Sequence, residues 1–79
     1  MKKVTVYTQN ECPPCKIVKQ FLDHHQIAFE EINITENSKA RDFLINQLKS
    51  YSTPTVAVDN AIVKGFDIKT LEQLLGIQN

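Results

Sequence analysis

Two consecutive prolines between two cysteines, in the segment Cys12-Pro13-Pro14-Cys15, separate two different patterns of hydrophobicity. Before this segment, residues 4–7 (VTVY) form a short β-branched run, which predicts a strand. After it, four apolar residues recur at helical spacing: Ile17, Val18, Phe21 and Leu22. Proline suits the first helical turn because its missing N–H has no intrahelical partner there and its φ is already close to helical. We therefore predict an amphipathic helix from Pro13 to about His25.

The rest of the chain continues to alternate between strand and helix patterns. We predict a strand over 29–34, and a helix that follows the N-cap candidates of 35–38 and ends near Ser50. Two short strands follow over 55–58 and 61–64, joined by the turn residues Asp59 and Asn60. A last helix is expected after the N-cap residue Asp67, with Gly76 as the glycine just beyond its end.

The order β-α-β-α-β-β-α predicts an α/β fold. The first two strands are joined through a helix and must be parallel with a right-handed crossover, whereas the last two form an antiparallel hairpin. We expect a four-stranded mixed sheet of order 2-1-3-4 with helices on both faces. Open α/β sheets carry their chemistry beyond the carboxyl ends of the parallel strands. The segment from Thr8 to Cys15 lies at such a strand end.

Composition excludes several classes of function. The chain has 79 residues with nine Lys or Arg and nine Asp or Glu, so its formal net charge is zero. This length predicts one domain over residues 1–79. Without a basic excess, neither nucleic acid nor an anionic membrane surface is an expected partner. No apolar run approaches the roughly 20 residues of a membrane span. The sequence also shows no signal-peptide pattern, so we expect the protein in the cytoplasm. We also expect it to be a monomer.

The two cysteines are the candidate catalytic residues. A lone Cys-x-x-Cys pair in a cytosolic chain is more often catalytic or metal-binding than a structural disulfide. Cys12 is placed at or beside the helix N-cap, where free amides and the helix dipole favour an anion such as a thiolate. Cys15 lies one turn inside the helix and should be less exposed. We therefore expect Cys12 to attack a substrate disulfide and Cys15 to resolve the mixed disulfide.

Neighbouring residues are expected to tune this dithiol. Pro13 and Pro14 stiffen the start of the helix, while Lys16 and Lys19 carry charges that favour a thiolate. The dipole and amide contributions should outweigh these solvated charges, which salt screens. Glu30 and Glu31 are interpreted as a solvated strand end.

The cysteine pair also fits three roles outside redox chemistry. Both cysteines could be inert. A structural zinc site needs four ligands, and only the adjacent His24 and His25 could add to the two cysteines. A soft-metal carrier of ferredoxin-like fold usually has a methionine where this chain has Asn10, and needs a further strand where a helix is predicted.

Three segments together resemble the glutaredoxin and NrdH-redoxin family. They are the Val-Tyr-Thr-x-x-x-Cys-Pro-x-Cys pattern of residues 6–15, the pair Thr53-Pro54, and Gly65-Phe66-Asp67 before the last helix. The resemblance covers essentially the whole chain in order and spacing. It implies a minimal thioredoxin-like fold, thiol–disulfide exchange, a redox-active Cys12–Cys15 disulfide, and no bound cofactor.

The resemblance also implies which residues bind the partner. In thioredoxin-like folds, the proline of a pair such as Thr53-Pro54 is cis and faces the dithiol, and the backbone before it pairs with the substrate chain. Gly65, Phe66 and Asp67 are then expected beside the same site. Phe66 could instead belong to the core, as could Tyr7.

Two subfamilies differ in the reductant. Glutaredoxins usually have Tyr after the first proline of the dithiol, a Lys shortly before the first cysteine, and a Gly-Gly pair followed by Asp. Here Pro14 stands in place of Tyr, the loop before Cys12 has Gln9 and Asn10, and Lys64-Gly65 replaces Gly-Gly, whereas Asp67 is retained. Gly65-Phe66 resembles the Ser-Gly-Phe segment of NrdH-redoxins, although their usual Cys-x-Gln-Cys and Trp are absent. We favour an NrdH-like carrier, reduced by thioredoxin reductase and serving ribonucleotide reductase. The alternatives are a glutathione-dependent glutaredoxin and a soft-metal-binding protein.

Overall fold

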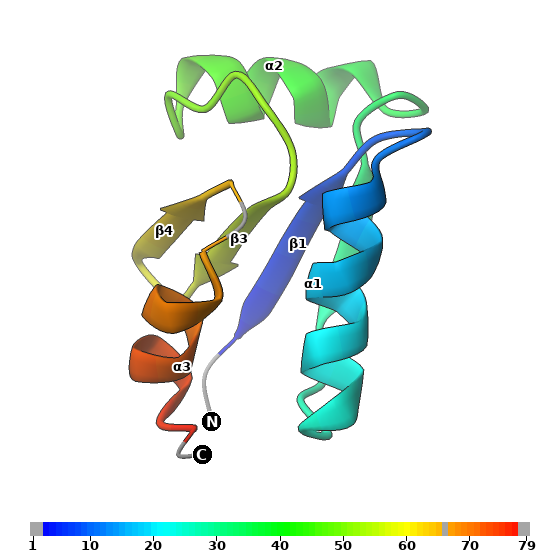
Figure 1. The fold of residues 1–79 in the computed structure, drawn as a ribbon. Coiled ribbons are helices and arrows are strands. Elements are labelled where there is room, and N and C mark those ends of the chain that lie inside the picture. The colour runs from blue at the N-terminus through cyan, green and yellow to red at the C-terminus, as the bar shows by residue number, and fades with distance from the viewer. Residues whose placement is uncertain (1–2, 66, 78–79) are drawn as a thin grey trace.

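The computed structural model describes residues 3–65 and 67–77 and has the predicted order of elements (Figure 1). The elements are β1 (Val4–Thr8), α1 (Pro13–His24), β2 (Glu30–Asn33), α2 (Ser38–Asn46), β3 (Thr55–Val58), β4 (Ala61–Lys64) and α3 (Ile68–Leu75). Among the described residues, no helix has the length and apolar character that crossing a membrane requires.

The four strands form one mixed sheet in the predicted order, β2-β1-β3-β4. β1 is parallel to β2, with Tyr7 opposite Ile32, and antiparallel to β3, with Tyr7 opposite Thr55. β3 and β4 form the hairpin, whose turn residue Asp59 has a left-handed φ of +53°. The carboxyl ends of β1 and β2 meet at one edge of the sheet, where the loop to α1 begins.

Helices cover both faces of the sheet, as predicted. α1 and α3 pack on one face and α2 lies against the other (Figure 1). The main core lies under α1 and α3 and contains eight buried residues: Val4, Val6, Val18, Leu22, Val56, Val58, Val63 and Leu71. On the opposite face, the ring of Tyr7 stacks on Phe43 of α2 with centroids 6.5 Å apart. All five residues of β1 are buried because the strand is covered on both sides.

The prediction that the second helix ends near Ser50 is wrong, because α2 ends at Asn46. The amides of Gln47 and Leu48 both bond to the carbonyl of Phe43, and Lys49 takes a left-handed φ of +56°. Leu48 remains half-buried beyond the helix end, so the apolar stripe continues although the backbone has left the helix. The spacing of apolar residues predicts which side chains face the sheet, but it does not predict where the helical hydrogen bonds end.

The apolar face of α1 also differs from its prediction at one position. Val18 and Leu22 are fully buried, but Ile17 is 48% exposed. Successive helical residues are rotated by about 100°, so the stripe that contains Val18 and Leu22 turns Ile17 toward solvent.

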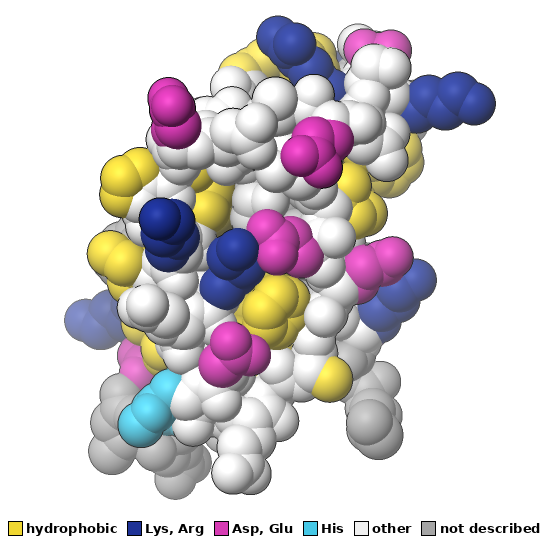
Figure 2. Space-filling model, turned by 90° about the vertical axis from the view of Figure 1, so that its right-hand side faces the viewer, with side chains coloured by type: hydrophobic (Ala, Val, Ile, Leu, Met, Phe, Trp, Pro, Cys, Tyr) yellow, Lys and Arg dark blue, Asp and Glu magenta, His cyan; other side chains and the backbone are white. Residues whose placement is uncertain are grey.

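Charged side chains of both signs are interleaved on the α1 side of the molecule. Figure 2 shows this side with Lys and Arg side chains lying among Asp and Glu side chains. This distribution agrees with the formal net charge of zero.

Candidate active site

The two cysteines lie at the start of α1, after the loop that follows β1. Cys12 is the N-cap residue of α1, and Pro13 and Pro14 occupy the first two helical positions, as predicted. The sulfurs of Cys12 and Cys15 form a disulfide, with the two Cα atoms 5.3 Å apart. One helical turn therefore brings the two sulfurs into bonding range, and this separation is ordinary for disulfides, whose Cα atoms usually lie about 4.4–6.8 Å apart.

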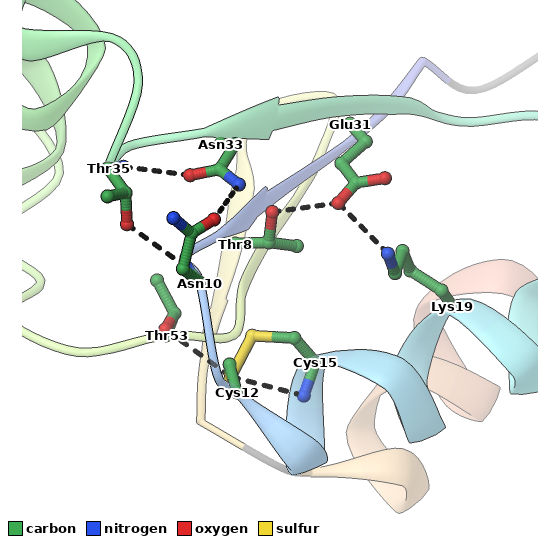
Figure 3. A network of polar contacts seen from close by, with 9 residues as sticks. All are labelled: Thr8, Asn10, Cys12, Cys15, Lys19, Glu31, Asn33, Thr35 and Thr53. Atoms are coloured by element: carbon green, nitrogen blue, oxygen red, sulfur yellow. Dashed lines mark hydrogen bonds and ion pairs between the residues drawn. A yellow bond between two sulfur atoms is a disulfide. The ribbon is translucent and has the colours of Figure 1, made fainter.

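Two hydrogen-bond donors point at the sulfur of Cys12 (Figure 3). The backbone N–H of Cys15 lies 3.3 Å from Cys12 Sγ, and the Thr53 hydroxyl lies 3.5 Å from it. A donor favours the charged form of the group that accepts from it. Both donors are therefore placed where they would favour a thiolate on Cys12 if its sulfur keeps this position in the reduced chain.

The two prolines restrict how many amides can reach this sulfur. An N-cap side chain normally accepts from the second or third helical residue. Here the second is Pro14, which has no N–H, so the donor is the third residue, Cys15. The amide of Lys16 bonds to the carbonyl of Cys12, 3.3 Å away, and the Cys15 N–H is shared between the sulfur and this carbonyl, which lies 3.1 Å from it. The first turn thus offers this sulfur fewer amides than expected, and the Thr53 hydroxyl supplies the second donor.

Burial distinguishes the two cysteines only slightly. Cys15 is 2% exposed and Cys12 is 7% exposed in the disulfide form. The order agrees with the expectation that Cys15 is the more deeply placed residue. Cys12 is nevertheless buried, because the segment that carries Thr53 lies against it.

The segment after α2 completes the site around Cys12. The Thr53–Pro54 peptide bond is cis, as the resemblance implied, and Pro54 is fully buried. The carbonyl of Pro54 accepts a bond from the Gly65 N–H at 2.8 Å, where Gly65 has a left-handed φ of +78°. Thr53, Pro54 and Gly65 are therefore brought together beside the dithiol. Phe66, predicted for the same site, lies outside the described residues.

Asp67 has a structural role in the folded chain. Its Oδ1 accepts from the Thr70 N–H at 3.1 Å and its Oδ2 accepts from the Thr70 hydroxyl at 2.7 Å. Both hydrogen bonds lower the pKa of the Asp67 carboxyl, with the larger effect from the hydroxyl. The side chain thus caps α3, as predicted, directly after the segment that reaches the site.

Lys19 and Glu31 are partners, which the sequence does not indicate. Lys19 Nζ forms an ion pair with Glu31 Oε2 at 3.0 Å. The Thr8 hydroxyl donates to the same oxygen at 2.9 Å (Figure 3). The bond from Lys19, and then that from Thr8, lowers the pKa of Glu31. Glu31 therefore ties α1 to the end of β1 and is more than a solvated strand end. Lys16 is exposed on α1.

A second polar cluster, absent from the sequence predictions, holds the loop before Cys12. The Asn10 N–H donates to Thr35 Oγ1 at 3.0 Å, and Asn33 Nδ2 donates to Asn10 Oδ1 at 2.9 Å (Figure 3). The only signal in the sequence is the polar character of these residues at two strand ends. Their contact depends on the parallel register of β1 and β2, which the sequence does not show.

The described part of the chain offers little to a metal ion. Within residues 3–65 and 67–77, no group of three or more His, Cys, Asp or Glu side chains is arranged to hold one. His24 and His25 contact each other at the opposite end of α1 from the cysteines.

Comparison with known proteins agrees with this geometry. The glutaredoxin family model matches residues 4–63. The chain belongs to the glutaredoxin family. It is 38% identical over 71 residues to the glutaredoxin-like protein NrdH of Lactococcus lactis subsp. lactis, a match that covers 90% of this chain and 97% of the relative. It is 28% identical over 67 residues to glutaredoxin 3 of Escherichia coli, covering 85% of this chain and 81% of that protein.

Solved structures share the same fold. A mutant of the thioredoxin-like protein BC3987 is 50% identical, with a TM-score of 0.94, and the match covers 99% of this chain and 100% of that one. The NrdH-redoxin of Escherichia coli is 25% identical, with a TM-score of 0.80, over 91% of this chain and 93% of that one. Glutaredoxin and NrdH family members are thiol–disulfide oxidoreductases. Together with the Cys12–Cys15 pair, the comparisons identify this glutaredoxin-like chain as a thiol–disulfide redox protein of thioredoxin-like fold.

Proposed function

We propose that this chain is a small electron carrier that reduces protein disulfides, with Cys12 as nucleophile and Cys15 as resolving thiol. The observation that carries the proposal is the position of Cys12 Sγ at the start of α1, with donors 3.3 and 3.5 Å away from Cys15 and Thr53. A thiolate in such a position is favoured, and the thiolate is the attacking species.

The proposed reduction of a partner disulfide consists of two exchanges, after which a reductant must restore the dithiol. The Cys12 thiolate attacks one sulfur of the partner's disulfide, that S–S bond breaks, and the partner's other sulfur leaves as a thiolate that takes a proton from solvent. Cys15, having lost its proton, then attacks Cys12 Sγ and releases the partner's second sulfur. The partner has gained two electrons, and the chain is left with the Cys12–Cys15 disulfide.

Partner binding is proposed at the segment opposite the dithiol. Thr53 is half-buried beside Cys12, and the family resemblance implies that the backbone before Pro54 pairs with an extended partner chain. In this proposal Thr53 and Pro54 align the partner's disulfide, with Gly65, Phe66 and Asp67 on one side of it. Pro13, Pro14 and Lys16 tune the dithiol from the first turn of α1.

For the reductant, we propose thioredoxin reductase, and for the acceptor, ribonucleotide reductase. The similarity to NrdH of Lactococcus lactis supports this choice, as does that to the E. coli NrdH-redoxin, which is described as having a thioredoxin-like activity profile. Pro14 and Gln9 stand where a glutathione-dependent glutaredoxin usually has Tyr and Lys. The proposal places the protein in the cytoplasm, where dithiols are kept reduced.

Turnover with two reducing systems tests this proposal. One assay supplies NADPH and thioredoxin reductase, and the other supplies NADPH, glutathione and glutathione reductase, each with insulin as the disulfide substrate. We expect faster insulin reduction with thioredoxin reductase. Faster turnover with glutathione would assign the chain to the glutathione-dependent glutaredoxins.

The roles of the cysteines are tested with Cys12→Ser and Cys15→Ser. Cys12→Ser should abolish insulin reduction, whereas Cys15→Ser should accumulate mixed disulfides with the substrate, visible by non-reducing mass spectrometry. Trapped species in the Cys12→Ser protein instead would reverse the assigned roles. Activity in both variants would remove the dithiol from the mechanism.

A further inference from the structure

We propose that Asn33 and Thr35 are positioning residues for Cys12, acting through Asn10. Asn33 is the last residue of β2, and Thr35 lies just after that strand. Both hold the loop of residues 9–11, which sets where Cys12 meets the start of α1. We call Asn10, Asn33 and Thr35 the Asn10 anchor. The inference rests on the proposed role of Cys12 as the nucleophile.

Two hydrogen bonds hold Asn10 in place. Its backbone N–H donates to Thr35 Oγ1 at 3.0 Å, and its side-chain Oδ1 accepts from Asn33 Nδ2 at 2.9 Å. Figure 3 shows the three side chains gathered beside the end of β1, on the Cys12 side of the sheet edge. Because both the backbone and the side chain of Asn10 are held, the residue is fixed in position and in rotation.

The orientation of the Asn33 amide is determined by its other contact. Asn33 Oδ1 accepts from the backbone N–H of Thr35 at 2.8 Å. A backbone N–H can only donate, so the oxygen of the amide must face it and the NH₂ must face Asn10. Ile34, between Asn33 and Thr35, is attached to the sheet because its N–H donates to the Thr8 carbonyl at 2.8 Å. The anchor thus fixes the loop before Cys12 relative to β2.

The backbone between the anchor and the dithiol is conformationally unfavourable. Glu11 is the one residue between Asn10 and Cys12, and it has a φ of +56°. Residues other than glycine rarely adopt this left-handed region, and they stay there only when the flanking structure holds them. Here α1 holds one flank and the anchor holds the other. Release of Asn10 should let Glu11 return to a negative φ and move Cys12 from its N-cap position.

Displacement of Cys12 should weaken its interactions with the helix end. The sulfur would lose alignment with the Cys15 N–H and with the dipole of α1. On the usual strength of charge–helix-end interactions, the thiolate pKa should then rise by roughly 0.2–0.7 pH unit. Among the described residues, no hydrogen bond joins the anchor to either sulfur, so this effect would be transmitted through the backbone.

A matched set of variants tests the inference in the full-length reduced protein. Thr35→Val removes the acceptor for the Asn10 N–H while keeping the side-chain shape, and Thr35→Ser keeps the hydroxyl. Asn33→Leu removes the donor to Asn10 Oδ1. The control is Asn37→Ala, which removes an exposed bond of the same kind, from the Ala40 N–H to Asn37 Oδ1 at 3.0 Å, at the start of α2.

The readout is the pH dependence of iodoacetamide alkylation of Cys12, located by mass spectrometry, with urea unfolding measured in parallel. We expect Thr35→Val and Asn33→Leu to raise the thiolate pKa, and Thr35→Ser and Asn37→Ala to leave it at the wild-type value. The inference is overturned if neither anchor variant shifts the pKa, or if Asn37→Ala shifts it equally for the same loss of stability. A wild-type pKa that is not lowered would contradict the proposed function itself, which separates the two failures.

Discussion

The Thr53 hydroxyl lies 3.5 Å from Cys12 Sγ, although 41 positions separate the two residues in the chain. The sheet order places β3 beside β1, so the segment that enters β3 passes the loop that leaves β1. Fold topology therefore supplies Cys12 with a donor that its own helix does not provide.

Removing that donor should make Cys12 a weaker acid. Thr53→Val keeps the shape of the side chain but loses the hydroxyl, and we expect the thiolate pKa to rise by roughly half to one pH unit. Thr53→Ser, which retains the hydroxyl, is the matched control. Alkylation rates of the reduced proteins across pH give the pKa values. An equal pKa for the Val and Ser variants would show that the hydroxyl is not engaged with the thiolate.

Replacing the second proline should have the opposite effect. Pro14→Ala introduces an N–H at the second helical position, where an N-cap side chain commonly finds a donor. The new amide should lower the pKa of Cys12 by a few tenths of a pH unit, on the scale of about 1.4 kcal/mol per unit. Pro13→Ala is the comparison variant and should lower the pKa less, since the first helical amide is not a usual donor to the N-cap side chain. The idea fails if Pro14→Ala leaves the alkylation profile unchanged.

The Lys19–Glu31–Thr8 contacts should make stability depend on pH. The pKa of Glu31 is lowered in the folded chain, so its contribution is complete above the unfolded-state pKa and is lost as pH falls through the folded-state value. At pH 7, Glu31→Gln should lower the free energy of unfolding by about 0.5–1 kcal/mol, since the pair is partly solvent-exposed. The difference from wild type should shrink as pH falls below about 4. Urea unfolding at pH 7 and pH 3 measures both values, and a constant difference would contradict the assignment.

Two positions on α1 should respond very differently to truncation. Leu22 is fully buried, so Leu22→Ala should lower the free energy of unfolding by about 2–5 kcal/mol. Ile17 is 48% exposed, and Ile17→Ala should change it by no more than about 0.5 kcal/mol. Comparable losses in urea unfolding would mean that the helix is rotated from the orientation described.

The architecture could be predicted from the sequence because local signals are strong there. The prolines at the start of α1, the Asp67 cap and the left-handed Gly76 all have a direct local cause, and each appears as expected. The crossover and hairpin rules predict the β1–β2 and β3–β4 pairs, and the structure joins these pairs through β1 and β3 in the expected order. The end of α2 was missed because Leu48 continues the apolar stripe after the helical bonding has ended.

The polar part of the site could not be predicted in the same way. The sequence offers Lys19 as a charge that favours a thiolate, but its partner Glu31 lies on a strand whose register with β1 no local pattern reveals. The contact of Asn33 with Asn10 depends on the same register. Such contacts are decided by tertiary geometry, so the sequence indicates which residues are polar and leaves their partners open.

The most direct test of the proposed chemistry is the thiolate pKa of Cys12 in the reduced wild-type chain, measured from thiolate absorbance at 240 nm and checked by site-resolved alkylation. A nucleophilic Cys12 at the start of α1 should have a value clearly below the roughly 8.5 of a free cysteine, and below that of Cys15. A value for Cys12 at or above about 8.5, or a lower value for Cys15 than for Cys12, would contradict it.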